Sequence, residues 1–267
     1  QKGEMLAIVG KNGAGKSTLS NLICGFLKPG QGRILFGGED IADWSIKERG
    51  EKIGLVMQNP NQMISKPMIY DEVALGLAVR GVPEEEIKER VYATLKICGL
   101  YQFRNWPVSA LSFGQKKRVT IASILVLHPQ VLILDEPTSQ LDPIAASDFL
   151  ATLGKINREL GTTILLTEHR LEEAFSFASR VAVMDGGKLL CTGTPAEVGA
   201  ELKSSGNAMF LAMPAAMRIW AASDSKATCP ISVCDGRNWL LDYAKTHELQ
   251  AIPEETKNAP NGETVVS

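Results

Sequence analysis

The chain of 267 residues is long enough for one full hydrophobic core and a smaller lobe, and 45% hydrophobic with 22% charged residues is an ordinary globular composition. A formal net charge of −2 gives no electrostatic support for nucleic-acid binding. The five cysteines are odd in number and form no C-x-x-C pair, so neither a disulfide framework nor a zinc site is predicted, and a reducing, cytosolic setting fits best.

The apolar stretches fall short of the roughly 18 residues that indicate a membrane-spanning helix, so any membrane role is expected to be peripheral. The first residue is Gln1 rather than methionine, and "QKGE" leads into an apolar run without a signal-peptide pattern. We therefore expect the sequence to begin inside a domain.

The first predicted element is an apolar strand, residues 6–9, followed by a glycine-rich segment and a helical pattern. The segment matches G-x-x-x-x-G-K-[ST] in the strand, loop, helix context that this motif requires. Its glycines let successive backbone N–H groups point at phosphate oxygens, and the following helix adds its positive N-terminal dipole. The alternative, a glycine-rich turn with an exposed lysine, is disfavoured by that context. The segment consists of Gly10, Lys11, Asn12, Gly13, Ala14, Gly15, Lys16, Ser17 and Thr18.

Within this segment, Lys16 is expected to reach the β- and γ-phosphates of a nucleotide, and Ser17 to ligate Mg²⁺.

Short apolar runs then alternate with helical patterns, which predicts an α/β fold with a mostly parallel, buried sheet. The pattern between residues 69 and 127 is helical instead and indicates a helical lobe inserted into the core. Pro83 opens one helix that Gly99 caps, and Pro143 opens another that Gly161 ends. The predicted strands are residues 6–9, 33–36, 53–57, 131–134, 163–166 and 181–184.

The pattern weakens after residue 200. Helical patterns cover residues 208–222 and 238–245, and we interpret residues 201–250 as a small appended lobe. Residues 251–267 are polar with two prolines, which predicts a disordered tail or linker.

Two carboxylates, Asp135 and Glu136, end the apolar strand at residues 131–134. A buried carboxylate is costly without a partner. Asp135 is well placed to take the Mg²⁺ bound at Ser17, and Glu136 is the candidate that orients and polarises an attacking water. The alternative is that the two carboxylates only mark a solvated strand end before Pro137. The phosphate loop at residues 10–18 makes this the less favoured interpretation.

Polar side chains also follow two other strands: Gln58 after residues 53–57 and His169 after residues 163–166. Taken alone, a histidine or a glutamine at such a position is more often a structural residue than a catalytic one. Ligands of open α/β sheets bind outside the carboxyl ends of the strands, so His169 is expected to contact a γ-phosphate there. Gln58 is expected to reach Mg²⁺ or the water through its amide oxygen.

The stretch "LSFGQKKR", residues 111–118, offers the Ser112 hydroxyl and the Gly114 N–H at a helix start, which is a second anion-binding arrangement.

Taken in order, these motifs resemble those of an ABC-type ATPase domain with a P-loop NTPase fold. GKNGAGKST, Gln58, LSFGQ, VLILDEPTS, the following Gln140-Leu141-Asp142 and His169 look like its Walker A, Q-loop, signature, Walker B, D-loop and switch histidine. The resemblance covers roughly residues 1–200. Within the family, "VMQNPNQMI" and "CPISVCDGRNWL" look most like the ATPase components of energy-coupling-factor (ECF) vitamin and metal importers.

The resemblance implies ATP and Mg²⁺ as cofactors and a head-to-tail dimer of ATPase domains. Two ATP molecules lie between the Walker A of one domain and the signature of the other, so Ser112 and Gly114 are expected to act on the partner's ATP. Gln115 and Asp142 complete the nucleotide-binding residues that the resemblance implies.

Closure on ATP and opening after hydrolysis would drive a separately encoded membrane subunit, which works with a substrate-binding subunit. The resemblance places the docking groove near the Q-loop and helical lobe, where Met57, Met63 and Met68 are expected to offer adaptable apolar surface. The chain is thus expected at the cytoplasmic side of the membrane as a peripheral importer subunit.

Two departures from the family pattern stand out. Phe113 occupies a position where the family usually has glycine. The family also has strands upstream of Walker A, with an aromatic residue that stacks on adenine, and this sequence starts after them; a missing stacking partner would weaken binding by roughly 1–3 kcal/mol.

The alternative is a non-transport ABC ATPase that acts on ribosomes or DNA. DNA-handling relatives carry a very long coiled coil between Walker A and signature, and no heptad run intervenes here. A ribosome-associated translation factor would be expected to carry a basic, arm-like insertion, and this sequence does not show one. A nucleotide-binding regulator without turnover would not need Glu136 and His169. The sequence names neither the solute nor the partner ATPase, which is an identical chain, a homologue or a second domain beyond Ser267.

Overall fold

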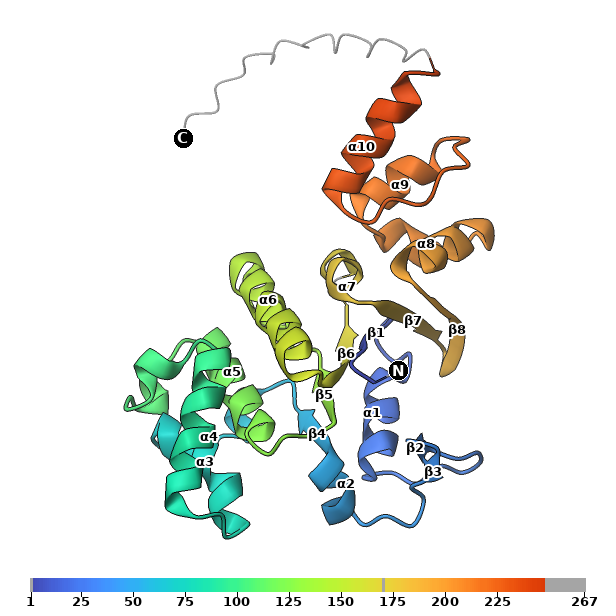
Figure 1. Ribbon diagram of the computed structural model, residues 1–267. Coiled ribbons are helices and arrows are strands. Elements are labelled where there is room, and N and C mark those ends of the chain that lie inside the picture. Colours follow the sequence, from blue (N-terminus) through green and yellow to red (C-terminus); the bar gives the residue numbers. More distant parts are fainter. Residues whose placement is uncertain (1, 170, 248–267) are drawn as a thin grey trace, which may run out of the picture.

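The computed structural model describes residues 2–169 and 171–247. Within them, the main sheet has six strands in the order β4-β5-β6-β1-β7-β8 (Figure 1). The first five pair in parallel and β8 is antiparallel to β7, which confirms the predicted α/β fold. The strands are β1 (Met5–Gly10), β4 (Ile53–Val56), β5 (Val131–Asp135), β6 (Thr163–Glu168), β7 (Arg180–Asp185) and β8 (Lys188–Gly193).

The two faces of the sheet bury different side chains, because successive residues of a strand point to opposite faces. In β1, Ala7 and Val9 lie in the largest core cluster, whereas Ile8 between them lies in another. In β5, Ile133 likewise faces away from the cluster that its neighbours join. A sheet buried on both faces needs a helical layer on each, which is why its strands are continuous apolar runs in the sequence.

One face of the sheet is covered by α1 (Lys16–Cys24), with Cys24 in the cluster of Ile133. The neighbouring α2 (Ile46–Lys52) is tied to α1 by Arg49, whose guanidinium donates to the carbonyl oxygens of Leu22 at 3.1 Å and Ile23 at 3.0 Å. The opposite face carries α5 (Phe113–Leu125), α6 (Pro143–Leu160) and α7 (Leu171–Phe177).

The helix α6 follows the prediction at both ends. It begins at Pro143, and Gly161 ends it in the left-handed conformation with φ of 62°. Phe149 and Leu153 are buried as expected, but Leu160 is 39% exposed because it lies in the last turn, beyond the reach of the core.

Between β4 and β5 the chain is mostly helical, with α3 (Ile69–Val79) and α4 (Glu84–Ile97) preceding α5 (Figure 1). Short 3₁₀ turns link them. The α5 helix packs on α3 and α4 and also on β4 and α6, so it belongs to both the helical region and the core. The boundaries of a separate lobe stay a prediction.

Two local predictions, one strand and one helix, differ from the structure. The expected strand at residues 33–36 is reduced to β2 (Leu35–Phe36), which pairs with β3 (Glu39–Asp40) in a separate two-stranded sheet. The expected helix at residues 208–222 is broken, because Pro214 cannot continue it. It forms a 3₁₀ turn over Ala208–Ala212 and then α9 (Ala215–Ala221).

The C-terminal part of the described chain is made of α8 (Pro195–Ser204), α9 and α10 (Val233–Ala244). The helix expected at residues 238–245 begins earlier, because Ser232 and Asp235 form a capping box at its start. Among the described residues, none of the helices combines the length and apolar character that a bilayer crossing requires. Residues 251–267, predicted as a tail, lie outside the described residues.

We predict that Gly10→Ala destabilises the fold. A Cβ at Gly10 would lie 2.3 Å from the backbone oxygen of Met184 in β7, so the two strands must shift apart. The expected loss is about 1–3 kcal/mol in the free energy of unfolding, measured by urea denaturation. The control is Gly30→Ala, where no atom lies within 4 Å of the new methyl and the change is expected to stay within about 0.5 kcal/mol.

Candidate functional site

The sheet register brings the ends of three neighbouring strands together. Val9 of β1 lies opposite Glu168 of β6, and Thr167 of β6 lies opposite Asp135 of β5. The loop after β1 therefore faces the residues that follow β5 and β6. Carboxyl ends of parallel strands form the usual ligand crevice of α/β proteins.

The loop after β1 curls around the side chain of Lys16 and borders a cavity. Gly13 and Gly15 adopt φ of 79° and 96°, which residues with side chains rarely adopt. Lys16 is only 5% exposed, and its Nζ donates to the backbone oxygens of Gly10 at 2.9 Å and Lys11 at 3.2 Å. One cavity of about 320 Å³ is lined by Asn12, Gly13, Ala14, Gly15, Lys16, Ser17, Thr18, Glu136 and His169.

Two hydroxyls converge on one oxygen of Asp135. Ser17 Oγ donates to Asp135 Oδ1 at 3.1 Å, and Thr167 Oγ1 donates to the same oxygen at 2.7 Å. The two residues predicted to share Mg²⁺, Ser17 and Asp135, thus lie within hydrogen-bond distance of each other, and their role as metal ligands stays a prediction. Thr167 was not predicted from the sequence, where its only signal is a hydroxyl residue at the end of an apolar strand.

Glu136 lies at the centre of the predicted catalytic residues. Its Oε2 accepts a hydrogen bond from Gln58 Nε2 at 3.2 Å, and its Oε1 contacts His169 Nε2. Its backbone N–H donates to Thr167 Oγ1 at 3.0 Å, and its φ of 46° turns the chain sharply after β5. The three side chains predicted from three separate strand ends therefore meet at Glu136; Glu136 and His169 line the phosphate cavity, and Gln58 lines an adjoining cavity.

The oxygen groups beside the loop suit a hard cation. Mg²⁺ prefers oxygen ligands and is usually held by one or two carboxylates together with phosphate oxygens. The Ser17 hydroxyl and the Asp135 carboxylate already lie within hydrogen-bond distance of each other. Gln58 and Asp135 line one adjoining cavity of about 410 Å³. This donor set fits Mg²⁺.

The signature residues lie elsewhere. Ser112 caps the N-terminus of α5, where its Oγ accepts from Gln115 N at 3.3 Å and its N–H donates to Gln115 Oε1 at 2.9 Å. Asp142 caps α6 by accepting from Ala145 N at 2.9 Å. A Cβ at Gly114 would lie 3.6 Å from the Leu141 side chain. These residues are near one another but do not line the phosphate cavity.

A buried lysine that the sequence analysis did not single out lies behind Glu136. Lys117 of α5 is 2% exposed, and its Nζ donates to the carbonyl oxygens of Pro137 at 2.6 Å and Ser139 at 2.9 Å. Burial lowers the pKa of Lys117 to about 8, against the opposing effect of the Glu168 and Glu136 carboxylates. The amine is therefore still protonated at neutral pH.

Lys117 had one signal in the sequence. It shares a helical face with Thr120, Ile121 and Ile124, at spacings of three, four and seven residues, so a charge interrupts an otherwise core-facing stripe.

Comparison with known proteins agrees with this site. The ABC transporter family model matches residues 1–139. An ABC transporter ATP-binding protein of Enterococcus faecalis is 60% identical over 196 residues, which are 73% of this chain and 34% of that protein. One of Clostridium perfringens is 56% identical over 197 residues, with 74% and 34% covered. The chain spans about a third of the length of these curated relatives.

Solved structures agree as well. The cbiO1 protein of Clostridium perfringens, described as part of the ABC transporter complex cbiONQ, has a TM-score of 0.73 at 40% identity and covers 82% of this chain and 88% of its own. A dimeric ATP-binding cassette bound to ADP and phosphate has a TM-score of 0.64 at 30% identity, covering 73% and 87%.

The P-loop fold, the phosphate cradle and the family match point to one conclusion. The chain belongs to the ABC transporter ATP-binding family, whose ATP-binding domains are ATPases.

Proposed function

We propose that this chain is the ATP-hydrolysing nucleotide-binding subunit of an ECF-type ABC transporter and powers import of a small solute, a vitamin or a metal ion. The observation that carries the hydrolytic part is the convergence of Gln58 and His169 on Glu136 beside the phosphate loop. The likeness to cbiO1 supports the ECF-type part. The chain then works at the cytoplasmic face of the membrane as a peripheral subunit.

In this proposal each side chain has one task. The loop N–H groups of residues 10–18 and Lys16 bind the β- and γ-phosphates. Glu136 orients the attacking water and accepts its proton, and His169 contacts the γ-phosphate. Ser17, Asp135 and Gln58 would hold Mg²⁺, which neutralises phosphate charge when bound.

The signature residues act across a dimer in this proposal. Ser112, Gly114 and Gln115 do not line the phosphate cavity of their own chain, which supports a role on a partner's ATP. Asp142 lies beside them at the start of α6. The partner is a second ATPase domain, either in another chain or in the same one. The dimeric cassette bound to ADP and phosphate supports this arrangement.

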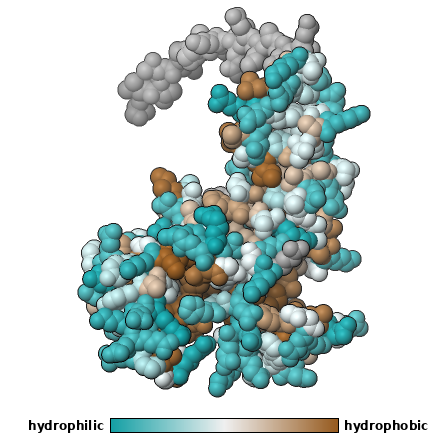
Figure 2. All heavy atoms as spheres, in the orientation of Figure 1, coloured by the Kyte–Doolittle hydropathy of each residue, from teal (hydrophilic) through white to brown (hydrophobic). Residues whose placement is uncertain are grey.

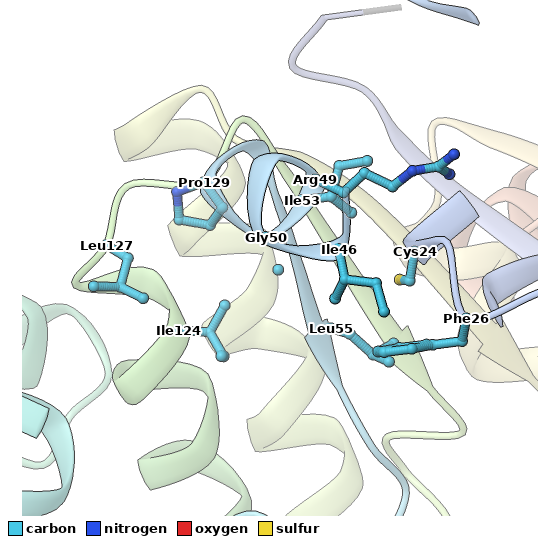
Figure 3. A pocket seen from close by; sticks show the side chains of 11 residues that line it. Cys24, Phe26, Ile46, Arg49, Gly50, Ile53, Leu55, Ile124, Leu127 and Pro129 are labelled. Carbon is cyan, nitrogen blue, oxygen red and sulfur yellow. The ribbon is translucent and has the colours of Figure 1, made fainter. Parts of the chain in front are cut away.

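A groove of about 190 Å³ offers a docking surface for the membrane subunit (Figure 3). It lies between α2, β4 and the C-terminal end of α5, with Ile46 and Leu55 facing Ile124 and Leu127 across it. Phe26 at its rim is 55% exposed. Figure 2 shows apolar side chains, in brown, between the α3–α5 region and the region of α1 and α2.

The methionines expected to line a docking groove do not line this one. Met57 is 46% exposed but borders the cavity of Gln58 and Asp135. The Met63 side chain packs on the core instead, and its Sδ accepts from Met57 N at 3.2 Å. Met68 is half-buried at the start of α3. The apolar surface is supplied mainly by Ile, Leu and Phe.

We predict that Glu136→Gln retains ATP binding and abolishes turnover. The amide keeps the size of the side chain but cannot accept a proton, which costs roughly 10²–10⁴-fold in rate. Phosphate release and nucleotide affinity are measured on the same preparation. The matched control is Glu159→Gln, an exposed glutamate of α6, and wild-type-like hydrolysis by Glu136→Gln removes Glu136 from its role.

We predict that Lys16→Ala weakens nucleotide binding. A charged hydrogen bond contributes about 1.5–3 kcal/mol, which corresponds to roughly a tenfold to hundredfold higher Kd for ATP. Titration calorimetry measures the change. Lys155→Ala, which removes an exposed lysine of α6, is the control, and an unchanged Kd in Lys16→Ala contradicts the phosphate-loop assignment.

The transport assignment is tested by affinity capture of the complete protein from gently solubilised membranes, followed by mass spectrometry. We expect small, strongly hydrophobic membrane proteins together with an ATPase partner, and the substrate-binding subunit identifies the cargo. Recovery of ribosomes or chromosomal DNA instead contradicts the importer assignment and leaves the ATPase chemistry untouched.

A further inference from the structure

The turn at residues 137–139 connects the catalytic carboxylate to the start of α6. The residues on either side of it, Glu136 and Gln140, have φ of 46° and 65°. Residues with side chains are uncommon in this left-handed region, and they persist there only where surrounding contacts hold them. The position of Glu136 therefore depends on what holds this turn.

Lys117 holds the turn from the side of α5. Its Nζ donates to the Pro137 oxygen at 2.6 Å and to the Ser139 oxygen at 2.9 Å, so one amine bridges both ends of the turn. The side chain is 2% exposed, so water does not compete for these hydrogen bonds. Hydrogen bonds from a charged donor are among the strong ones in proteins.

Glu168 holds the same turn from the side of β6. Its Oε1 accepts from the Thr138 N–H at 2.9 Å, and its Oε2 accepts from the His169 N–H at 3.2 Å. The turn is thus hydrogen-bonded on one side to the buried Lys117 of α5 and on the other side to the buried Glu168 of β6. The Glu168 carboxylate therefore bonds to the backbone of both the turn and His169. It links the turn to Glu136 and His169, the two side chains that line the phosphate cavity opposite the loop.

The start of α5 lies close to Lys117 and to the segment that follows the turn. The Phe113 ring centroid lies 5.4 Å from Lys117 Nζ, in the range of a cation–π contact. A glycine at position 113, the usual residue of the family pattern, offers no ring for this contact. A Cβ at Gly114 would lie 3.6 Å from the side chain of Leu141, which directly follows Gln140, so the backbone of the first turn of α5 lies close to this segment.

We propose that Lys117 is a positioning residue for ATP hydrolysis, which ties the turn at residues 137–139 to the start of α5 and so keeps Glu136 aimed at the phosphate cavity. Through the same contacts, Ser112 at the N-terminus of α5 is joined to the catalytic carboxylate of its own chain. The inference rests on the proposed role of Glu136 in hydrolysis.

The test is Lys117→Met in the complete protein, within its membrane complex. Methionine keeps the length and apolar stem of lysine but donates no hydrogen bond. A misplaced catalytic group costs roughly tenfold to hundredfold in rate, so we expect kcat for ATP to fall by that factor. KM for ATP and the Kd for ADP are expected to stay within about twofold, because Lys117 does not line the phosphate cavity. Lys117→Arg, which keeps a charged donor, is expected to restore part of kcat.

The matched control is Lys203→Met. Lys203 also donates to a backbone oxygen, that of Ser223 at 3.4 Å, and also lies over an aromatic ring, with its Nζ 4.3 Å from the centroid of Trp220. These contacts are in the C-terminal part of the chain, so the same chemical loss is expected to leave kcat unchanged.

An unchanged kcat in Lys117→Met overturns the proposal, as does a fall in kcat that is matched by an equal loss of nucleotide affinity. If Lys117→Met does not fold, Lys117→Leu, which also lacks a hydrogen-bond donor, carries the same test, and failure of both to fold makes Lys117 a residue of stability alone. Wild-type-like hydrolysis by Glu136→Gln would instead refute the proposed function. A loss of turnover in Glu136→Gln with an unaffected Lys117→Met refutes only this inference.

Discussion

The nucleotide site depends on the parallel register of β1, β5 and β6. Because all three strands run in one direction, their carboxyl ends meet at one edge, with Val9 beside Glu168 and Asp135 beside Thr167. A shift of one residue in β5 would turn Asp135 toward the opposite face of the sheet and separate it from Ser17. The same slip would also force the apolar residues of β5 to repack against the opposite helical layer, because both faces of the sheet are buried.

The polar groups at this edge are held by partners that the fold supplies. Burying a charge without compensation is costly, so each charged group needs hydrogen bonds or an opposite charge. Lys16 donates to two backbone oxygens of its own loop, and Asp135 accepts from two hydroxyls. Glu136 contacts both Gln58 and His169. Fixed groups of this kind lose little free energy to reorganisation when a reaction develops charge beside them.

Local patterns in the sequence predict much of this arrangement. The phosphate loop has fixed spacing, and the apolar strand before Asp135 shows where the carboxylates come out of the sheet. Pro143 and Gly161 mark the ends of α6 because each acts on its own backbone. Lys117 and Thr167 were not predicted, since their partners lie 20 or more residues away and depend on how α5 and β6 pack. β8 was missed because four of its six residues are exposed and its apolar run is limited to Leu189, Leu190 and Cys191.

The position of α5 explains how two distant parts of the proposed mechanism are joined. Its N-terminus carries Ser112, which the dimer proposal places at the partner's ATP, while the body of the helix packs on α3, β4 and α6. Ser112 and Lys117 belong to the same helix of 13 residues, so a displacement of its first turn would reach Lys117. Lys117 lies in its second turn and bonds to the chain directly after Glu136. In the proposed dimer, contact with one nucleotide would therefore be coupled, through two hydrogen bonds to backbone oxygens, to the carboxylate that acts on the other.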